Sequence, residues 1–196
     1  MPDHFNEIDF GELQIAPEIG ELVRRKAEII PFFTKVDNGF ACLSQWHTSY
    51  FTVDGVDYCT AEQYMMHAKA RLFGDTEMAE RILKVTAPHD HKRLGQNARG
   101  FDSQIWVRER CRIAFTGNLA KFSQSKGLRK RLLRTEGTIL AEANPKDSIW
   151  GIGMAYDDPD LQDTSRWRGM NLLGHVLTMV RERLLAASRE TCPVPE

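Results

Sequence analysis

A two-residue turn signal in the first third of the chain constrains the fold more than any other feature. Asp54 and Gly55 separate two short runs with strand composition, 50–53 and 56–58. A two-residue hairpin turn places both of its central residues at positive φ, a conformation that Asp and Gly tolerate. The sequence therefore predicts an antiparallel β-hairpin at this point.

A helix-start signal follows the hairpin with almost no intervening chain. Thr60 is followed three residues later by Gln63, which is the spacing of a capping box. Apolar residues then recur at helical spacing until Gly74, and glycine commonly stands just after the end of a helix. We therefore expect a helix over 61–73 that begins directly after the hairpin.

The rest of the chain is dominated by helical patterns. Pro31 is expected to end an N-terminal helix, Pro88 to interrupt the chain, and Asn118 to begin a separate helix. Helices are expected at 18–29, 76–85, 103–115, 119–122, 128–133 and 172–184, a strand at 138–143 and a loop at 144–168. This order indicates a compact, helix-rich α+β fold with a small antiparallel β element, because strands and helices do not alternate. No glycine-rich dinucleotide-binding or P-loop motif is present.

The two ends of the chain differ in composition from its middle. We expect an acidic leader over 1–30, a single domain over 31–186 and a short tail over 187–196. The leader lacks the features of a signal peptide, and no apolar run approaches the ~18 residues of a membrane span. The four cysteines show no CxxC spacing. These features favour a reducing, cytoplasmic location and no membrane partner.

The net charge of −1 hides a strong asymmetry along the chain. Fourteen Lys and Arg residues stand between Arg81 and Arg134, against three acids. Such a block suggests an anionic partner, either the phosphates of a small molecule or a nucleic acid. A solvated helix surface explains the same charges, and the charge pattern leaves both interpretations open.

Two charged residues of the predicted 61–73 helix are candidates for chemistry. Glu62 stands in the first turn, where the free N–H groups and the helix dipole favour the ionised carboxylate. Lys69 follows two turns later on the same face, so the two side chains can line one pocket. Alternatively, Glu62 only caps the helix and Lys69 is solvated.

A loop with acids, an indole and two glycines is a candidate ligand site. Glu142, Asp147 and Trp150 are followed by Gly151 and Gly153, where a ligand could stack on the indole and approach the backbone closely. The alternative is a tight turn closed by a core Trp. His89 and His91 lack further ligands, so we predict no metal site. A second aromatic set with small residues consists of Trp106, Trp167, Gly169 and Asn171.

The ordered set of motifs over about 31–185 resembles the NADAR family, also called YbiA-like. The motifs that carry the resemblance are Asp54-Gly55, Thr60-Ala61-Glu62-Gln63-Tyr64 with Lys69-Ala70, Leu94-Gly95, Trp106, Lys121-Phe122, Leu132-Leu133, Glu142, Asp147, Trp150-Gly151-Ile152-Gly153, Trp167-Arg168-Gly169-Met170-Asn171 and Leu173-Gly174. The resemblance implies a compact helix-rich α+β fold and an N-glycosidase that splits the C1′–N bond of a phosphorylated ribose. The substrate would be an ADP-ribosylated guanine, free or in nucleic acid, or a ribosylamino-pyrimidine of riboflavin synthesis.

The resemblance carries Glu62, Lys69 and Asp147 over as site residues, and the chemistry of N-riboside cleavage suggests their roles. Glu62 would stabilise the positive charge that develops on the ribose and activate water, with Asp147 as a second carboxylate. The motifs would place Lys69, Trp106, Trp150, Gly151, Gly153, Trp167 and Asn171 in the pocket. Lys69 and the basic block, including Arg93, Arg99 and Arg108, would suit phosphates. No cofactor is implied, and the alternatives are a non-catalytic ADP-ribose or nucleotide-binding module and a nucleic-acid-binding module that relies on the basic block.

Overall fold

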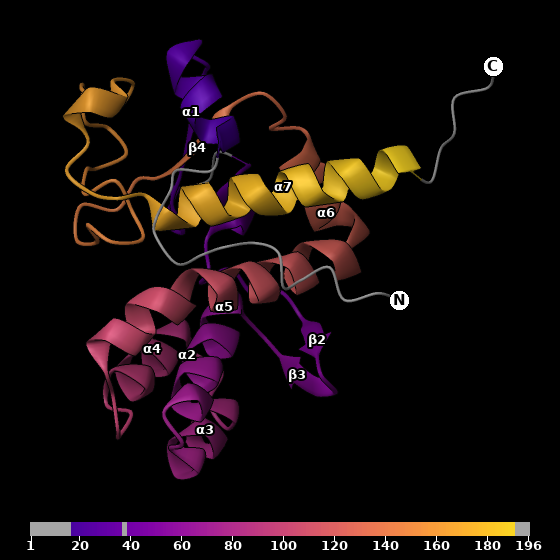
Figure 1. The fold of residues 1–196 in the computed structure, drawn as a ribbon, viewed down its shortest axis with the longest axis vertical. Coiled ribbons are helices and arrows are strands. Elements are labelled where there is room, and N and C mark those ends of the chain that lie inside the picture. Colours follow the sequence, from indigo (N-terminus) through magenta and orange to yellow (C-terminus); the bar gives the residue numbers. More distant parts are fainter. Residues whose placement is uncertain (1–16, 37–38, 191–196) are drawn as a thin grey trace.

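The structure is a computed structural model that describes residues 17–36 and 39–190, and helices dominate it (Figure 1). The α-helices are α1 (Pro17–Arg24), α2 (Ala61–Leu72), α3 (Thr76–Leu83), α4 (Pro88–Gln96), α5 (Ser103–Gln124), α6 (Lys126–Leu133) and α7 (Leu172–Glu190). Two short 3-10 helices are η2 (Ala41–Leu43) and η3 (Thr164–Arg166). The strands are β1 (Ile29–Phe32), β2 (Phe51–Val53), β3 (Val56–Tyr58) and β4 (Ile139–Glu142). The predicted helix-rich α+β class is confirmed.

The predicted hairpin is present as the antiparallel pair of β2 and β3. Phe51 pairs with Tyr58 across the two strands. Asp54 and Gly55 form the turn with φ values of 50° and 77°, so both central residues occupy the left-handed region that the turn requires. Local sequence determines this element, because the turn residues and the strand residues favour the same conformation.

The second sheet differs from what the sequence predicts. Strands β1 and β4 pair in parallel, with Ile29 opposite Ile139 and Pro31 opposite Ala141. The expected helix over 18–29 ends at Arg24, and Pro31 lies within a strand instead of ending a helix. Proline is tolerated there because the two-stranded sheet leaves one side of β1 without a strand partner, so the missing N–H breaks no ladder bond.

Helix α2 begins as the sequence predicts. The Thr60 side chain accepts a hydrogen bond from the Gln63 N–H at 3.0 Å, and the Gln63 side chain reaches back to the Cys59 N–H at 2.8 Å. The helix ends at Leu72 with Phe73 as its C-cap, and Gly74 follows with a φ of 73°. The hairpin and the helix start are thus joined without a free linker.

Two helix predictions are wrong at their boundaries. Helix α4 begins at Pro88, which stands in its first turn, where its missing N–H costs no intrahelical bond. Helix α5 runs unbroken through Asn118, which was expected to begin a new helix. The Asn118 side chain instead donates hydrogen bonds to the Ala114 carbonyl and the Gln45 side chain, so a tertiary contact uses its polar group.

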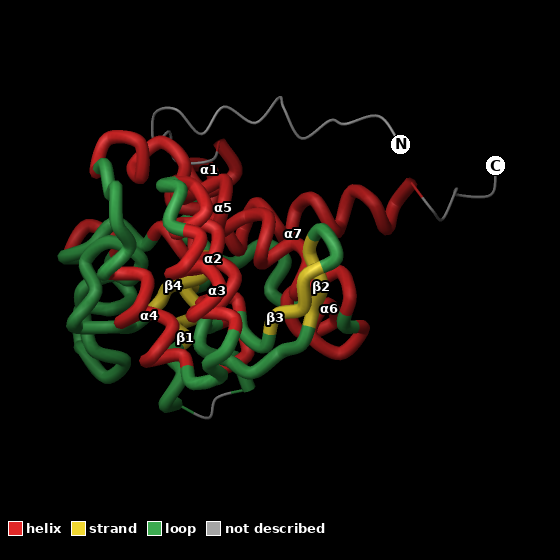
Figure 2. The backbone as a smooth tube through the Cα atoms, turned by 90° about the horizontal axis from the view of Figure 1, so that it is seen from below, coloured by secondary structure: helices red, strands yellow, loops and turns green. Residues whose placement is uncertain are grey.

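The main hydrophobic core lies where α7 packs against α5 and β4 and where α2 packs against α3, α4 and α5 (Figure 1). A second, smaller core lies under α1 and includes Leu22, Ile29, Ile139 and Met154. The two small sheets lie apart, and most of the remaining chain is helix or loop (Figure 2). In the part of the chain that the structure describes, no helix has the length and apolar composition needed to cross a membrane.

Candidate active site

Glu62 lies in the first turn of α2 and is 4% exposed. The loop after η2 covers it: the Glu62 N–H donates to the Gln45 carbonyl at 3.1 Å, and the Trp46 side chain is hydrogen-bonded to the Glu62 carboxylate. Burial raises the pKa of Glu62 to about 7, although Lys92, Trp46 and Lys69 favour the ionised form. The expectation that the helix N-terminus keeps Glu62 ionised is therefore corrected, because the loss of hydration outweighs the dipole.

Glu142 ends strand β4 and is 8% exposed. Burial raises its pKa to about 8, and the charges of Asp147 and Glu62 act in the same direction. The Asn171 side chain holds this end of the strand, since its Oδ1 accepts from the Glu142 N–H at 3.1 Å and its Nδ2 donates to the Leu140 carbonyl at 2.8 Å. Two buried carboxylates therefore influence each other from α2 and β4.

Asp147 lies in the segment between β4 and α7 (143–171), which we call the β4–α7 segment. Its Oδ1 accepts hydrogen bonds from the Ile149 and Trp150 N–H groups at 3.0 and 2.8 Å. Its Oδ2 lies 3.8 Å from the Nζ of Lys92 on α4. Asp147 thus folds its own loop and places a negative charge near both glutamates and the Lys92 cation.

Lys69 lies two turns along α2 from Glu62 and is 8% exposed. Its Nζ lies 4.4 Å from the ring centroid of Phe101 and 5.3 Å from that of Trp106. Burial lowers its pKa, and the charge of Glu62 opposes this shift. The structure therefore brings Glu62, Lys69 and Trp106 to one region of the molecule.

The glycines of the β4–α7 segment serve packing between main-chain segments. A Cβ on Gly151 would lie 2.8 Å from the Glu142 carbonyl oxygen and 2.9 Å from the Asp147 carbonyl oxygen. Gly153 has a φ of 68°, and a Cβ there would meet the Arg168 main chain at 3.0 Å. The space beside these glycines is filled by protein, so the expected close approach of a ligand is corrected to a close approach of backbone.

Several predicted pocket residues have other partners. The Trp167 Nε1 donates to the Leu161 carbonyl at 2.9 Å, and this indole packs on the smaller core. Arg93 pairs with Asp90 on its own helix, and Arg99 pairs with Asp75 and Glu77. Trp150 packs against the main core beside Asp147, and Asn171 is engaged by the backbone of β4.

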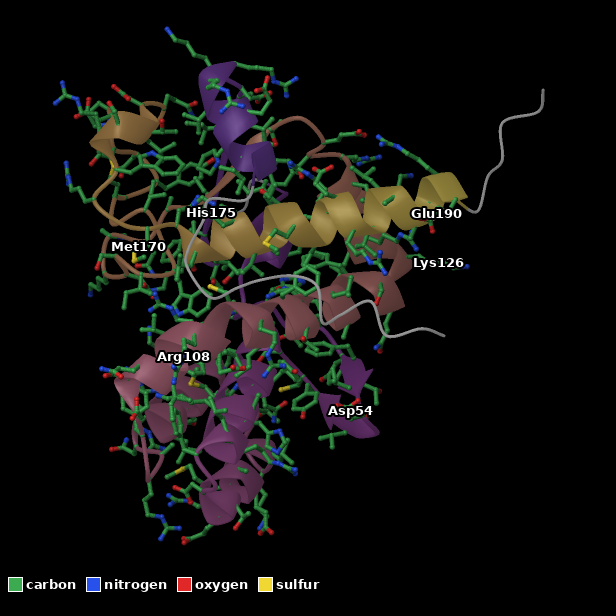
Figure 3. All side chains as sticks on the ribbon, in the orientation of Figure 1. Asp54, Arg108, Lys126, Met170, His175 and Glu190 are labelled. Carbon is green, nitrogen blue, oxygen red and sulfur yellow. The ribbon has the colours of Figure 1, made fainter. Side chains whose placement is uncertain are left out.

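A shallow hollow of about 320 Å³ lies at the beginning of α5 and is lined by Ser103, Gln104, Val107 and Arg108. Figure 3 shows Arg108 and Met170 on the same side of the molecule, at the beginnings of α5 and α7. None of the three carboxylates lines this hollow. We place the reacting centre at the carboxylates, because chemistry requires groups that hold or move protons.

The candidate site includes two residues that the sequence did not single out, Trp46 and Lys92. The Trp46 side chain is hydrogen-bonded to the Glu62 carboxylate, and the Lys92 charge favours the ionised form of Glu62. No sequence signal indicates these two residues, because their relation to Glu62 depends on how the loop and α4 pack against α2. Glu142, which the sequence places in the candidate ligand loop, is the second buried glutamate of the site.

Comparison with known proteins identifies the family of this chain. The model of the NADAR domain family matches residues 32–185. The chain belongs to this family of N-glycosidases, and is therefore a hydrolase that acts on N-glycosyl compounds. This result favours the enzyme over the non-catalytic binding module.

Individual relatives extend the comparison. N-glycosidase R617 of Acanthamoeba polyphaga mimivirus is 40% identical over 149 residues, which are 74% of this chain and 88% of that protein. The NMR structure of the Escherichia coli protein YbiA superposes with a TM-score of 0.68 at 26% identity, covering 97% of this chain and 96% of that one. Riboflavin biosynthesis protein VVA0006 of Vibrio vulnificus is 28% identical over 153 residues, which are 78% of this chain and 38% of that protein.

Proposed function

We propose that the protein hydrolyses the C1′–N bond of a phosphorylated ribose N-glycoside. The observation that carries the proposal is the pair of buried glutamates, Glu62 and Glu142, whose pKa values are raised to about 7 and about 8. Near neutral pH such a pair holds one proton between its two members. A site of this kind can offer a carboxylate and a carboxylic acid to the same bond.

Glu62 is the proposed carboxylate. Asp147 disfavours and Lys92 favours ionisation of both glutamates, but only Glu62 also has the Trp46 hydrogen bond and the Lys69 charge in favour of its ionised form. Cleavage of an N-riboside develops positive charge on C1′ and O4′, which a carboxylate stabilises. The same carboxylate can take a proton from the water that adds to C1′.

Glu142 is the proposed acid. As the C1′–N bond breaks, its electron pair moves to the leaving nitrogen, which then needs a proton. A protonated Glu142 donates that proton to the leaving nitrogen. Glu62 takes a proton from the attacking water, so the two glutamates together again hold one proton. Glycosidases that act on O-glycosides divide two carboxyl groups in the same way.

The remaining groups position the pair and the substrate. The Lys92–Asp147 ion pair fixes the charge environment of both glutamates. Lys69, next to the Trp106 ring, supplies a cation on the wall of the site. Trp106 and Trp150 are the proposed surfaces for stacking on a flat base.

Two substrates fit this chemistry: an ADP-ribosylated guanine and a ribosylamino-pyrimidine phosphate. Both contain a C1′–N bond and phosphate, and the resemblance to the family supports both. The riboflavin biosynthesis protein among the relatives supports the second. Hydrolysis would release ADP-ribose from the first and ribose 5-phosphate from the second.

A Glu62→Gln variant tests the proposed function. The wild-type protein is incubated with each substrate, and the released sugar phosphate is followed by mass spectrometry. The variant keeps the side-chain shape but removes the charge, so we expect kcat to fall by about 10²- to 10⁴-fold. Affinity for the sugar phosphate should remain within about threefold, because the aromatic and cationic groups are intact.

Two results would contradict the proposal. A wild-type protein that releases neither product would exclude both substrates. A Glu62→Gln variant that matches the wild-type rate would exclude Glu62 as the proposed base. A matched Glu80→Gln variant, which alters an exposed acid on α3, is expected to keep the wild-type rate.

A further inference from the structure

Arg110 on α5 is a buried cation with no acidic partner. The residue is 7% exposed, and its Nε atom is fully buried with no hydrogen-bond partner. The neighbouring Cys111 thiol, a weak acceptor, is hydrogen-bonded to the Arg110 side chain. Nε is one of the few fully buried side-chain nitrogen and oxygen atoms without a hydrogen-bond partner among residues 17–36 and 39–190. A buried guanidinium nitrogen without a partner is costly, so its presence requires an explanation.

Two more deeply buried cations, Lys121 and Arg181, donate hydrogen bonds to main-chain carbonyl groups. Lys121 donates to the Ser44 carbonyl at 2.8 Å. Arg181 donates to the Thr135 and Thr138 carbonyls, so it holds together the end of α6 and the turn before β4. These two cations have a structural use that accounts for their burial. Arg110 has no comparable use.

The position of Arg110 places it on the wall of the candidate active site. Trp106, Arg110 and Gly117 stand at spacings of four and seven residues, which form a single stripe along α5. Both flanking members of the stripe face α2: the Trp106 ring lies near the Lys69 Nζ, and a Cβ on Gly117 would clash with the Tyr64 ring. Arg110 therefore lies on the α2-facing side of α5, one turn from Trp106.

Lys69 adds a second cation to this wall. It is 8% exposed, and among the described residues it forms no ion pair, because its Nζ is covered by the Phe101 and Trp106 rings. Two buried cations thus belong to this wall, Lys69 beside the Trp106 indole and Arg110 one helical turn along α5 from Trp106, while Glu62 lies in the first turn of α2. This separation of charge divides the site into an acidic end and a basic end.

We propose that Arg110 binds a phosphate group of the substrate. This proposal rests on the proposed function. It adds a binding position for the substrate phosphate, at the side of α5 that faces α2. A guanidinium presents paired N–H donors that match two phosphate oxygens, and the hydrogen bonds are charge-assisted. A bound phosphate would supply the missing partner of the buried charge. The phosphate is either the 5′-phosphate of a ribose nucleotide or the diphosphate of ADP-ribose.

An Arg110→Met variant tests this proposal by calorimetric titration with ribose 5-phosphate, ADP-ribose and unphosphorylated ribose. Loss of a charge-assisted contact should weaken binding of the phosphorylated ligand by about 10- to 100-fold. The affinity for ribose should not change. Because Met removes an unpaired buried charge and keeps much of the volume, Tm should stay equal or rise. Whichever phosphorylated probe loses more affinity identifies the source of the phosphate.

A matched control is Arg112→Met on the same helix. Arg112 is exposed and pairs with Glu109, so its loss should leave the affinities for ribose 5-phosphate and ADP-ribose unchanged. Arg110→Lys keeps the charge but not the paired donors, so its affinity for the phosphorylated ligand should fall between those of wild type and Arg110→Met. If Arg110→Met does not fold, the lysine variant supplies the comparison.

Several outcomes would overturn the proposal. One is wild-type protein that binds ribose 5-phosphate and ADP-ribose no better than ribose. Another is a folded Arg110→Met variant with unchanged affinity for both phosphorylated probes. A third is an Arg110→Met variant with a lowered Tm that loses as much affinity for ribose as for the phosphorylated probes. This result would show that Arg110 has a structural role only. The proposed function is tested by a different result. If the wild-type protein cleaves neither N-riboside, the proposed function fails, whatever the effect of Arg110→Met on phosphate affinity.

Discussion

The Nζ atom of Lys92 lies 3.8 Å from the Oδ2 atom of Asp147, and this ion pair joins α4 to the β4–α7 segment. Lys92 also favours the ionised forms of both Glu62 and Glu142. The pair therefore modulates the pKa values that burial raises, with Lys92 lowering and Asp147 raising both, although neither residue needs to touch the substrate.

Replacing Lys92 by Met should move the pH dependence of the reaction. Its positive charge lowers the pKa of Glu62, so without it Glu62 ionises only at higher pH. We expect a bell-shaped profile of kcat against pH in the wild type. The acidic limb should shift upward by about 0.5–1 pH unit in the variant.

The measurement is kcat across the pH range for wild type, Lys92→Met and Lys130→Met. Lys130 is an exposed lysine on α6, so its loss should leave both limbs in place. An acidic limb that shifts downward in Lys92→Met would show that Lys92 does not stabilise the base.

Glu142 should make the folded protein less stable as the pH rises. Its folded pKa of about 8 lies above the ordinary value of 4.5, so between these values the folded state holds a proton that the unfolded state releases. The stability that this group contributes is complete below the unfolded pKa and is lost as the pH rises through the folded pKa. Relative to wild type, Glu142→Gln should gain about 2–4 kcal/mol of unfolding free energy between about pH 5 and about pH 9.

Urea denaturation at the two pH values measures this difference. The comparison is made within each pH value because other groups, such as the buried Lys121 with its lowered pKa, titrate as well. Glu80→Gln alters an exposed acid, so its unfolding free energy should differ from that of wild type by the same small amount at both pH values. A Glu142→Gln difference that does not grow with pH would contradict the raised pKa.

Asn171 should prove necessary for both stability and catalysis. Its side chain bonds to the Glu142 N–H and the Leu140 carbonyl, and its φ of 52° is unfavourable for most residues. Asn171→Gly should lower the unfolding free energy by about 2 kcal/mol, because two buried main-chain groups lose partners. Asn171→Ala should cost about 1 kcal/mol more, because Ala is also strained at positive φ.

Denaturation of both Asn171 variants separates the two effects. Equal stabilities would show that the backbone conformation is not a constraint. Both variants should also lower kcat by about tenfold or more, because the end of β4 that carries Glu142 is released. Wild-type kcat in a folded Asn171→Gly variant would show that this anchor does not position Glu142.

Two glycine substitutions should act in opposite directions. A Cβ on Gly174 would lie 2.1 Å from the Leu140 carbonyl oxygen, so Gly174→Ala should destabilise the fold by about 2–3 kcal/mol. Gly127 lies in α6 with no atom within 4 Å of the added Cβ, so Gly127→Ala should stabilise it by about 0.5–1 kcal/mol. Thermal unfolding of the two variants measures both changes. A Gly174→Ala protein as stable as wild type would show that α7 can move away from β4.

The arginines of the basic block differ in what neutralises them. The sequence directs attention to Arg93 and Arg99, yet Arg93 pairs with Asp90 on its own helix and Arg99 pairs with Asp75 and Glu77 at the beginning of α3. Arg110 belongs to the same block but is buried and unpaired. Charge is visible in the sequence, whereas the partner that neutralises a charge depends on which helices pack together.

Elements with local causes can be predicted from the sequence alone. The Asp54-Gly55 turn, the Thr60 cap of α2 and the Gly74 stop depend on conformational preferences and hydrogen bonds within a few residues. The positions of Glu62 and Lys69 on one helix face follow from the same periodicity. Only the tertiary structure decided the pairing of β1 with β4, the unbroken course of α5 and the meeting of Glu62 with Glu142. These depend on contacts between segments far apart in the chain, and burial at those contacts, more than the local helix dipole, controls the pKa of Glu62.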